Sequence, residues 1–130
     1  MQKLEKEVQL LLNLFKLKKL SEAELLNRKL IDENPKSIFL YNILGLILFD
    51  QKKIDEAIRY YEEGIKIDPN YASIYDNLGT AYKSKSEYEK AESYYLKSIN
   101  LDGNKSEPLN NLGNLYIVLN KSHKAIDSYK

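Results

Sequence analysis

Apolar and polar residues are distributed along this chain in a pattern that recurs every 34 residues. Leucine–glycine pairs keep this spacing, at Leu44-Gly45, Leu78-Gly79 and Leu112-Gly113. Alanines recur with the same spacing at another position of the repeat, at Ala23, Ala57, Ala91 and Ala125. Because several residue classes keep one period, the chain is predicted to be built from a repeated structural unit.

Each repeated unit predicts two helices that pack against each other as an antiparallel hairpin. A glycine inside a helix costs about 1 kcal/mol relative to alanine, so three glycines in one phase indicate helices that cross too closely for a side chain. The expected small partners on the second helices are Ala57, Ala91 and Ala125. Asn34-Pro35 and Asp68-Pro69 are expected to end second helices, because a residue before proline avoids the helical conformation. One hairpin cannot bury its apolar stripe alone, so stacked hairpins are expected to share a core.

Three segments carry a common motif of a bulky residue, then Leu-Gly, then a second bulky residue. They are Tyr41–Leu48, Tyr75–Tyr82 and Leu109–Tyr116. These segments resemble the signature of the tetratricopeptide repeat family. The resemblance covers nearly the whole chain and implies an all-α fold, a right-handed α-solenoid of stacked antiparallel helix pairs. On this resemblance, residues 1–130 are expected to form a single array, with repeats at 4–37, 38–71, 72–105 and 106–130.

The first and last repeats depart from this pattern. In repeat 4–37, Leu11 stands where glycine is expected, and Asn27 replaces the aromatic residue of the second helix. In repeat 106–130, the sequence stops part-way through the expected second helix. We therefore expect a truncated piece of a longer protein or, if the chain is complete, pairing of this last repeat with another molecule.

Composition and charge exclude several classes of function. The formal net charge is +1, so no strong field attracts nucleic acid or an acidic membrane surface. The absence of cysteine excludes disulfides, thiolate metal sites and cysteine nucleophiles. No apolar run reaches the roughly 18 residues that span a bilayer. No signal peptide is recognisable, so a cytoplasmic location is the default expectation.

No combination of residues in the sequence is typical of an enzyme. His123 is the only histidine and is expected to be a solvated surface residue. The sequence contains no glycine-rich phosphate loop, no paired-histidine metal motif and no nucleophile elbow. The eleven tyrosines recur at the same few positions of the repeat, which is typical of core packing rather than of base stacking. The protein is therefore predicted not to be an enzyme and to use no cofactor or metal.

The family resemblance implies that the first helix of each repeat lines a concave groove. The predicted apolar part of this groove consists of Val8, Leu12, Phe15, Phe39, Ile43, Leu46 and Phe49. The predicted peptide-binding part is rich in amides and consists of Asn42, Asp76, Asn77, Thr80, Asn110, Asn111 and Asn114. An amide carries both donor and acceptor atoms, which suits the backbone of an extended peptide.

Each part of this groove has a simpler interpretation. The amides are also explained as polar residues on a solvated helix face. The apolar residues are also explained if repeat 4–37 curves onto the next repeat or if an upstream helix covers them. Only an exposed apolar patch of a few hundred Å² or more would mark an interaction site.

Two precedents within the family narrow the kind of ligand. Asn77 and Asn111, one repeat apart, resemble the asparagine ladder in the repeats of O-linked N-acetylglucosamine transferases, although Ile43 interrupts it. Other family members grip the C-terminus of a chaperone with basic residues. The corresponding positions here hold Val8, Leu12, Ser73 and Asn77, so binding of such a tail is not expected.

The sequence therefore predicts a protein- or peptide-binding module that acts as an interaction scaffold. One alternative is the N-terminal, substrate-presenting repeat region of a larger enzyme such as a glycosyltransferase or sulfotransferase. The other is a scaffold that self-associates through repeat 106–130. Neither nucleic acid nor a membrane is expected as a partner.

Overall fold

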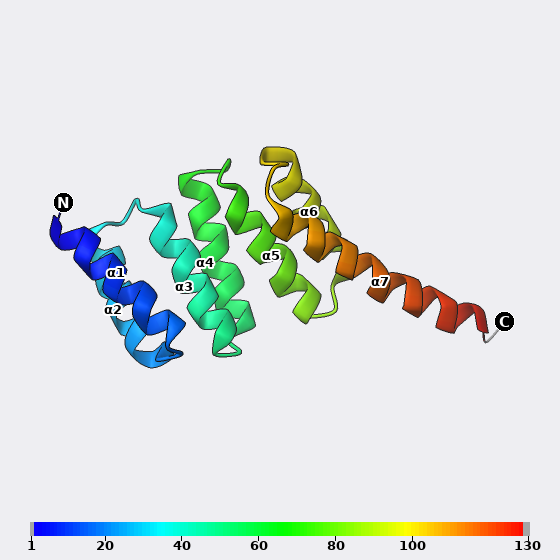
Figure 1. Cartoon of the computed structure of the whole chain (residues 1–130), viewed down its shortest axis with the longest axis horizontal. Helices are drawn as coiled ribbons and strands as arrows, with labels where there is room; N and C mark the ends of the chain where they lie inside the picture. The colour runs from blue at the N-terminus through cyan, green and yellow to red at the C-terminus, as the bar shows by residue number, and fades with distance from the viewer. Residues whose placement is uncertain (1, 129–130) are drawn as a thin grey trace. The chain divides into compact units, whose positions relative to one another are not determined.

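A computed structural model describes residues 2–128, and for residues 121–128 it describes the backbone alone. In this range all regular secondary structure is helical, which confirms the all-α class. The helices, shown in Figure 1, are α1 (Gln2–Lys16), α2 (Leu20–Glu33), α3 (Ile38–Asp50), α4 (Ile54–Ile67), α5 (Ala72–Ser84), α6 (Tyr88–Leu101) and α7 (Ser106–Ser128).

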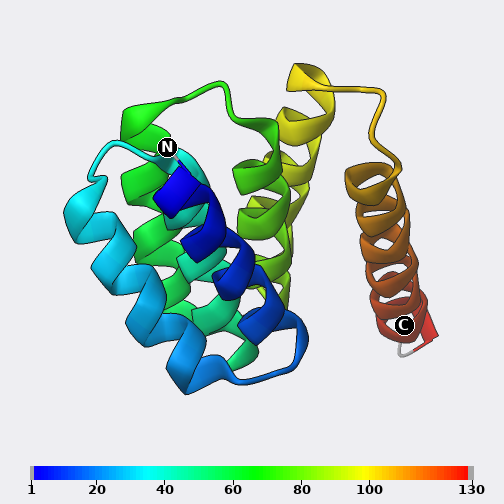
Figure 2. The ribbon, with the colours of Figure 1, turned by 60° about the vertical axis from the view of Figure 1, so that its left-hand side comes forward.

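The helices group into two compact units, Met1–Pro69 and Asn70–Lys130. Unit 1 contains α1 to α4, and unit 2 contains α5 to α7. Within each unit, helices that follow one another in sequence pack together. The pairs α1–α2, α3–α4 and α5–α6 form the expected helical hairpins, each joined by a short turn (Figures 1 and 2).

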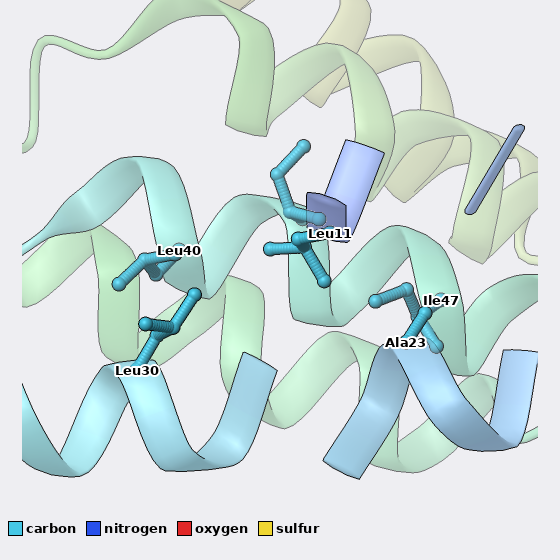
Figure 3. Packing of buried hydrophobic residues seen from close by; sticks show 6 residues of the cluster. Leu11, Ala23, Leu30, Leu40 and Ile47 are labelled. Atoms are coloured by element: carbon cyan, nitrogen blue, oxygen red, sulfur yellow. The ribbon is translucent and has the colours of Figure 1, made fainter. Parts of the chain in front are cut away.

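The core of unit 1 is shared between its two hairpins. Fully buried side chains from α1, α2 and α3 form one cluster, which includes Leu11, Ala23, Leu30, Leu40 and Ile47 (Figure 3). Because Leu40 and Ile47 of the second hairpin lie among residues of the first, the two hairpins bury one another's apolar stripes. This confirms, within unit 1, the prediction that stacked hairpins share a core.

Helix α3 is apolar on nearly all of its sides, which is typical of a helix enclosed by others. It packs against both α2 and α4. Its buried residues are Leu40, Asn42, Ile43, Leu44, Gly45, Ile47 and Leu48. The sequence of α3 thus encodes a central position in unit 1.

The glycines of the repeat motif pack on tyrosine rings, and not on the alanines that we expected. A methyl group built on Gly79 would lie 2.6 Å from ring atoms of Tyr95, and one built on Gly45 would overlap the ring of Tyr61. Ala57 and Ala91 are fully buried as well. The tyrosine ring reaches further across the helix pair than an alanine methyl group does, so it meets the glycine first. The expected partner Ala125 lies outside the side chains that the structure describes.

The fourth repeat does not form the expected hairpin. Helix α7 runs without interruption from Ser106 to Ser128, so the turn predicted within repeat 106–130 is absent (Figure 2). The segment around Asn120 contains neither proline nor glycine, and neither do the turns at Lys18, Lys52 and Ser86, so a missing helix breaker does not by itself explain why α7 continues. At Gly113, no described atom of another helix lies within 4 Å of the position that a side-chain carbon would take. His123 lies within this helix, but its expected exposure concerns a side chain outside the described set.

The turns inside the three hairpins place a residue with a side chain in the left-handed conformation. These residues are Lys18, Lys52 and Ser86, with φ angles of 63°, 69° and 61°. At the second turn, the Lys53 N–H donates to Leu48 O and the Lys52 N–H donates to Phe49 O, both at 2.9 Å. This pair of bonds defines a Schellman motif, whose left-handed position usually holds glycine.

Replacing Lys52 with glycine is expected to stabilise unit 1 by about 0.5–1 kcal/mol. The left-handed conformation costs a residue with a side chain about 1–2 kcal/mol, and part of this gain is lost to the greater freedom of glycine in the unfolded chain. Urea denaturation of the variant and the parent protein measures the difference. Lys52→Ala is the control, because alanine also removes the lysine side chain but gains nothing from a φ of 69°. Equal effects of the two substitutions would contradict the prediction.

Candidate peptide-binding surfaces

The seven apolar residues predicted to line a groove all lie in unit 1, on α1 and α3. Ile43 belongs to the buried core cluster. The other six are partly exposed and form what we call the apolar face: Val8, Leu12, Phe15, Phe39, Leu46 and Phe49. All of these except Phe49 pack against the core cluster. The apolar face therefore supports the core and also leaves apolar surface open to solvent.

An ion pair lies beside the apolar face, at the ends of α1 and α3. Lys18 Nζ is 2.9 Å from Asp50 Oδ2 and 5.5 Å from the centroid of the Phe15 ring. The Lys18 side chain is 70% exposed, so the pair contributes at most about 1 kcal/mol to stability. Its main effect is to place a cation, largely neutralised by a carboxylate, at the rim of the apolar face.

Asn42 is the one predicted peptide-binding residue in unit 1. It lies in α3 with only 6% of its surface exposed, and it has an interaction partner within the protein. Little of its side chain is therefore open to a ligand.

In unit 2, a hydrogen bond joins two of the predicted peptide-binding residues. Asn111 Nδ2 on α7 donates to Asp76 Oδ1 on α5 at 2.9 Å. Asp76 is 7% exposed, whereas Asn111 is partly exposed. The bond couples the first helices of two successive repeats and fixes the orientation of the Asn111 amide.

The remaining predicted residues of unit 2 differ in how open they are. Thr80 Oγ1 lies 2.9 Å from the hydroxyl oxygen of Tyr95, in a hydrogen bond that ties α5 to α6. Asn77 is partly buried and has an interaction partner. Asn110 and Asn114 are exposed on α7. We call Asn77, Asn110, Asn111 and Asn114 the amide surface, since these side chains retain some exposure.

Burial raises the pKa of the Asp76 carboxyl, and the nearby Glu107 carboxylate raises it further. The hydrogen bond from Asn111 and the charge of Lys105 act in the opposite direction but do not cancel the effect of burial. Lys105 itself is held nearby, because its Nζ donates to Ser73 Oγ at 3.0 Å. A raised pKa in the folded state means that unit 2 is more stable with this carboxyl protonated.

Asp76→Asn is expected to stabilise unit 2 at neutral pH and to have less effect in acid. In the parent protein, the favourable contribution is complete below the unfolded pKa near 3.8 and is lost as the pH rises through the raised folded pKa. Asparagine cannot ionise and still accepts the hydrogen bond from Asn111. Urea denaturation of both proteins across this pH range measures the difference.

The control for this prediction is Asp32→Asn, because Asp32 is an exposed aspartate on α2. Its stability difference from the parent protein should change little over the same range of pH. If Asp76→Asn also gave a difference independent of pH, the role assigned to the buried carboxylate would be wrong.

The structure shows a polar network in unit 1 that the sequence did not predict as a whole. Arg28 Nε donates to Glu24 Oε2 at 2.8 Å, and Arg28 Nη1 donates to the Tyr60 hydroxyl at 2.8 Å. Arg59 also lies over the Tyr60 ring, 5.5 Å from its centroid. Burial would raise the pKa of Glu24, but the hydrogen bond and charge of Arg28 and the charge of Lys53 lower it overall. The four-residue spacing of Glu24 and Arg28 predicts their pair, whereas the contact with Tyr60 depends on the packing of α2 and α4.

None of the helices in the described range is long and apolar enough to cross a membrane. Among residues 2–120, whose side chains the structure describes, no group of three or more acidic or histidine side chains is arranged to hold a metal ion.

Sequence models of tetratricopeptide repeats match the second half of the chain and part of the first. One model described as a TPR repeat matches residues 45–86. Two models described as tetratricopeptide repeats match residues 72–105 and 94–127. A comparison with curated protein sequences found no match.

Several solved structures have a similar fold at low sequence identity. The first TPR domain of Spaghetti (RPAP3), bound to the HSP90 peptide SRMEEVD, shares 24% identity with a TM-score of 0.82, covering 91% of this chain and 94% of that one. The Sgt2 TPR domain of Aspergillus fumigatus shares 17% identity with a TM-score of 0.86, covering 95% and 83%. The Yersinia enterocolitica type III secretion chaperone SycD, in complex with a peptide of the translocator YopD, shares 19% with a TM-score of 0.80, covering 90% and 95%.

Proposed function

Because residues 45–127 of this chain consist of tetratricopeptide repeats, we propose that the protein is a non-enzymatic interaction scaffold that binds an extended peptide segment of a partner. The observation that carries this proposal is the apolar face of unit 1, whose side chains remain partly exposed although most of them pack on the core. Two of the similar structures hold peptides, an HSP90 peptide in one and a YopD peptide in the other. These ligands support the class of function and do not identify the partner.

The apolar face favours a ligand with apolar side chains. Phe15, Phe39 and Phe49 offer aromatic surface, and aromatic rings contribute strongly to binding because they bury a large area at a small cost in conformational entropy. The cation at the rim is paired with Asp50. The affinity of this face is therefore expected to depend little on salt.

The amide surface of unit 2 favours recognition of peptide backbone. Asn110 and Asn114 are exposed, and each amide can donate to a carbonyl and accept from an N–H. Asn111 donates through Nδ2 to Asp76, and its Oδ1 is a further acceptor for a peptide N–H. Such contacts hold an extended chain without requiring a particular side chain.

Replacing Asn77 and Asn111 together with alanine is expected to weaken an extended-peptide ligand by about 1 kcal/mol or more, because each lost hydrogen bond contributes about that amount. Ligands are first selected from a displayed library of extended peptides, and their affinities are measured by calorimetry. The control double variant is Asn13→Ala with Asn100→Ala, at exposed positions on α1 and α6. If the Asn77 and Asn111 variant bound the peptide with unchanged affinity, the peptide would have to bind outside the amide surface.

Loss of the bond between Asn111 and Asp76 could alter the fold, so a second variant tests binding alone. Asn110→Ala with Asn114→Ala removes two exposed amides and should lower affinity without changing the free energy of unfolding. The peptide SRMEEVD is the control ligand. It is expected not to bind, because Val8, Leu12, Ser73 and Asn77 replace the basic residues that would hold its carboxylates.

Two narrower functions remain proposals. The similarity of Asn77 and Asn111 to the asparagine ladder of O-linked N-acetylglucosamine transferases favours a substrate-presenting region of a larger enzyme, and the coding sequence after residue 130 tests it. Self-association through repeat 106–130 is the other, and it depends on α7.

A further inference from the structure

One face of α7 lacks the covering that the equivalent faces of α3 and α5 have. We call it the Gly113 face, and it consists of Leu109, Gly113, Tyr116 and Ile117, which are spaced along one side of the helix. Leu109, Tyr116 and Ile117 are 47%, 44% and 55% exposed, and no described atom of another helix lies within 4 Å of the Cβ position of Gly113. The Tyr116 hydroxyl is bonded to Glu92, so its ring is anchored at one end.

In the preceding repeat, the equivalent face of α5 is covered by tyrosines of α6. Gly79 lies directly against Tyr95. Tyr94 stacks on both Tyr75 and Tyr82, with ring centroids 6.1 Å and 5.5 Å apart. The second helix of the hairpin thus provides an aromatic cover for the face that contains the glycine.

The residues that would provide the same cover on α7 are present in this chain. Tyr129 follows Tyr95 by 34 residues, as Tyr95 follows Tyr61. The same spacing places Ala125 in phase with Ala91, and the neighbouring Ile126 adds a large apolar residue. The segment 122–130 therefore has the sequence of a partner for the Gly113 face.

The backbone of residues 122–128 continues helix α7 and does not fold back along it. Helix α7 is continuous to Ser128, and at about 1.5 Å per residue Gly113 and Ser128 lie about 22 Å apart along its axis. The same segment from a second molecule has no such restriction.

We propose that two copies of the chain associate through α7, with segment 122–130 of each copy covering the Gly113 face of the other. The α5–α6 hairpin supplies the register, since Gly79 opposite Tyr95 corresponds to Gly113 opposite Tyr129. In that antiparallel register Tyr116 lies opposite Ile126, and the arrangement closes around a two-fold axis near residue 121. Each copy gives and receives the same segment, as a closed symmetric dimer requires.

The dimer is tested by sedimentation equilibrium of the whole chain over a wide range of concentrations. The parent protein is expected to change reversibly from monomer to dimer. Gly113→Leu fills the space intended for Tyr129 and should weaken dimerisation at least about tenfold. In the monomer the Cβ of this leucine has no described atom of another helix within 4 Å, so helix content should be kept or increased.

Asn13→Leu is the control, because it adds the same side chain to an exposed position on α1, outside both the Gly113 face and the amide surface. It should leave dimerisation unchanged. A dimer equally insensitive to Gly113→Leu would overturn the proposal, since another surface would then join the copies. A strict monomer that Gly113→Leu destabilises would overturn it in favour of segment 122–130 folding back on its own chain. Peptide affinity is measured separately, so failure of the dimer leaves the proposed function standing.

Discussion

Replacing Gly79 with alanine is expected to destabilise unit 2 by about 2–3 kcal/mol, although alanine is the better helix former by about 1 kcal/mol. The added methyl group would lie 2.6 Å from Cδ1 and Cε1 of Tyr95. The ring cannot move aside easily, because Tyr95 is 1% exposed and its hydroxyl is bonded to Thr80. Either α5 and α6 separate or the ring leaves its position, and both changes reduce core packing. Urea denaturation measures the loss.

Gly113→Ala is the matched control in dilute protein, where self-association is negligible. It changes the same residue of the same motif, but among the described residues no atom of another helix lies within 4 Å of the new methyl group. Here the helix propensity of alanine should dominate and stabilise α7 by up to about 1 kcal/mol. Effects of the same sign at Gly79 and Gly113 would contradict the proposed role of the tyrosine ring.

Replacing Asn27 with leucine is expected to stabilise unit 1 by about 1–3 kcal/mol, which is the cost of burying a polar group without a hydrogen bond. Asn27 on α2 is fully buried, and both Oδ1 and Nδ2 lack a hydrogen-bond partner. Leucine has the same number of side-chain heavy atoms in the same branched arrangement. It would therefore replace the amide by apolar atoms beside the core cluster with little change of shape. Thermal or urea denaturation of the two proteins measures the gain.

Asn42→Leu provides the control for this substitution. Asn42 on α3 is also buried, at 6% exposure, but it has an interaction partner. The same change should therefore destabilise unit 1 there. If Asn27→Leu were destabilising as well, the Asn27 amide must be satisfied by a group such as a bound water.

The repeat period predicted the helical hairpins but not the contacts inside them. The ends of α2 and α4 just before Pro35 and Pro69 agree with the pattern of the sequence. So does the burial of Leu44 and Leu78 in the repeated motif. The pairing of Gly79 with Tyr95 depends on how far a ring reaches across two helices, which spacing alone does not specify. The replacement of this pair by Leu11 and Asn27 in the first repeat was visible in the sequence. Its consequence, a buried amide without a partner, was not.

The turns show why the repeat phase did not predict the continuous helix α7. Lys18, Lys52 and Ser86 adopt the left-handed conformation without glycine or proline nearby, so packing of the two helices on each other must stabilise these turns. Asn120 occupies the same phase of the repeat, yet it continues the helix. The phase of a repeat therefore indicates where a turn fits, and tertiary packing decides whether it forms.

The candidate site was predictable to a similar degree. The repeat phase placed the apolar residues together on α1 and α3 and the amides on α5 and α7. It did not show which of these side chains are buried or hydrogen-bonded within the protein. Asn42 is buried in unit 1, and Asn111 donates a hydrogen bond to Asp76. Such differences depend on neighbouring helices, which a helix-face argument does not include.

Within each unit, the helices that pack together are one or two positions apart in chain order. Little chain entropy is lost in forming such contacts, because the loops that they close are short. Proteins rich in local contacts fold rapidly, and in repeat proteins folding can begin at any repeat. The hairpins are therefore expected to open one at a time, and amide hydrogen exchange measured residue by residue would reveal a different opening free energy for each.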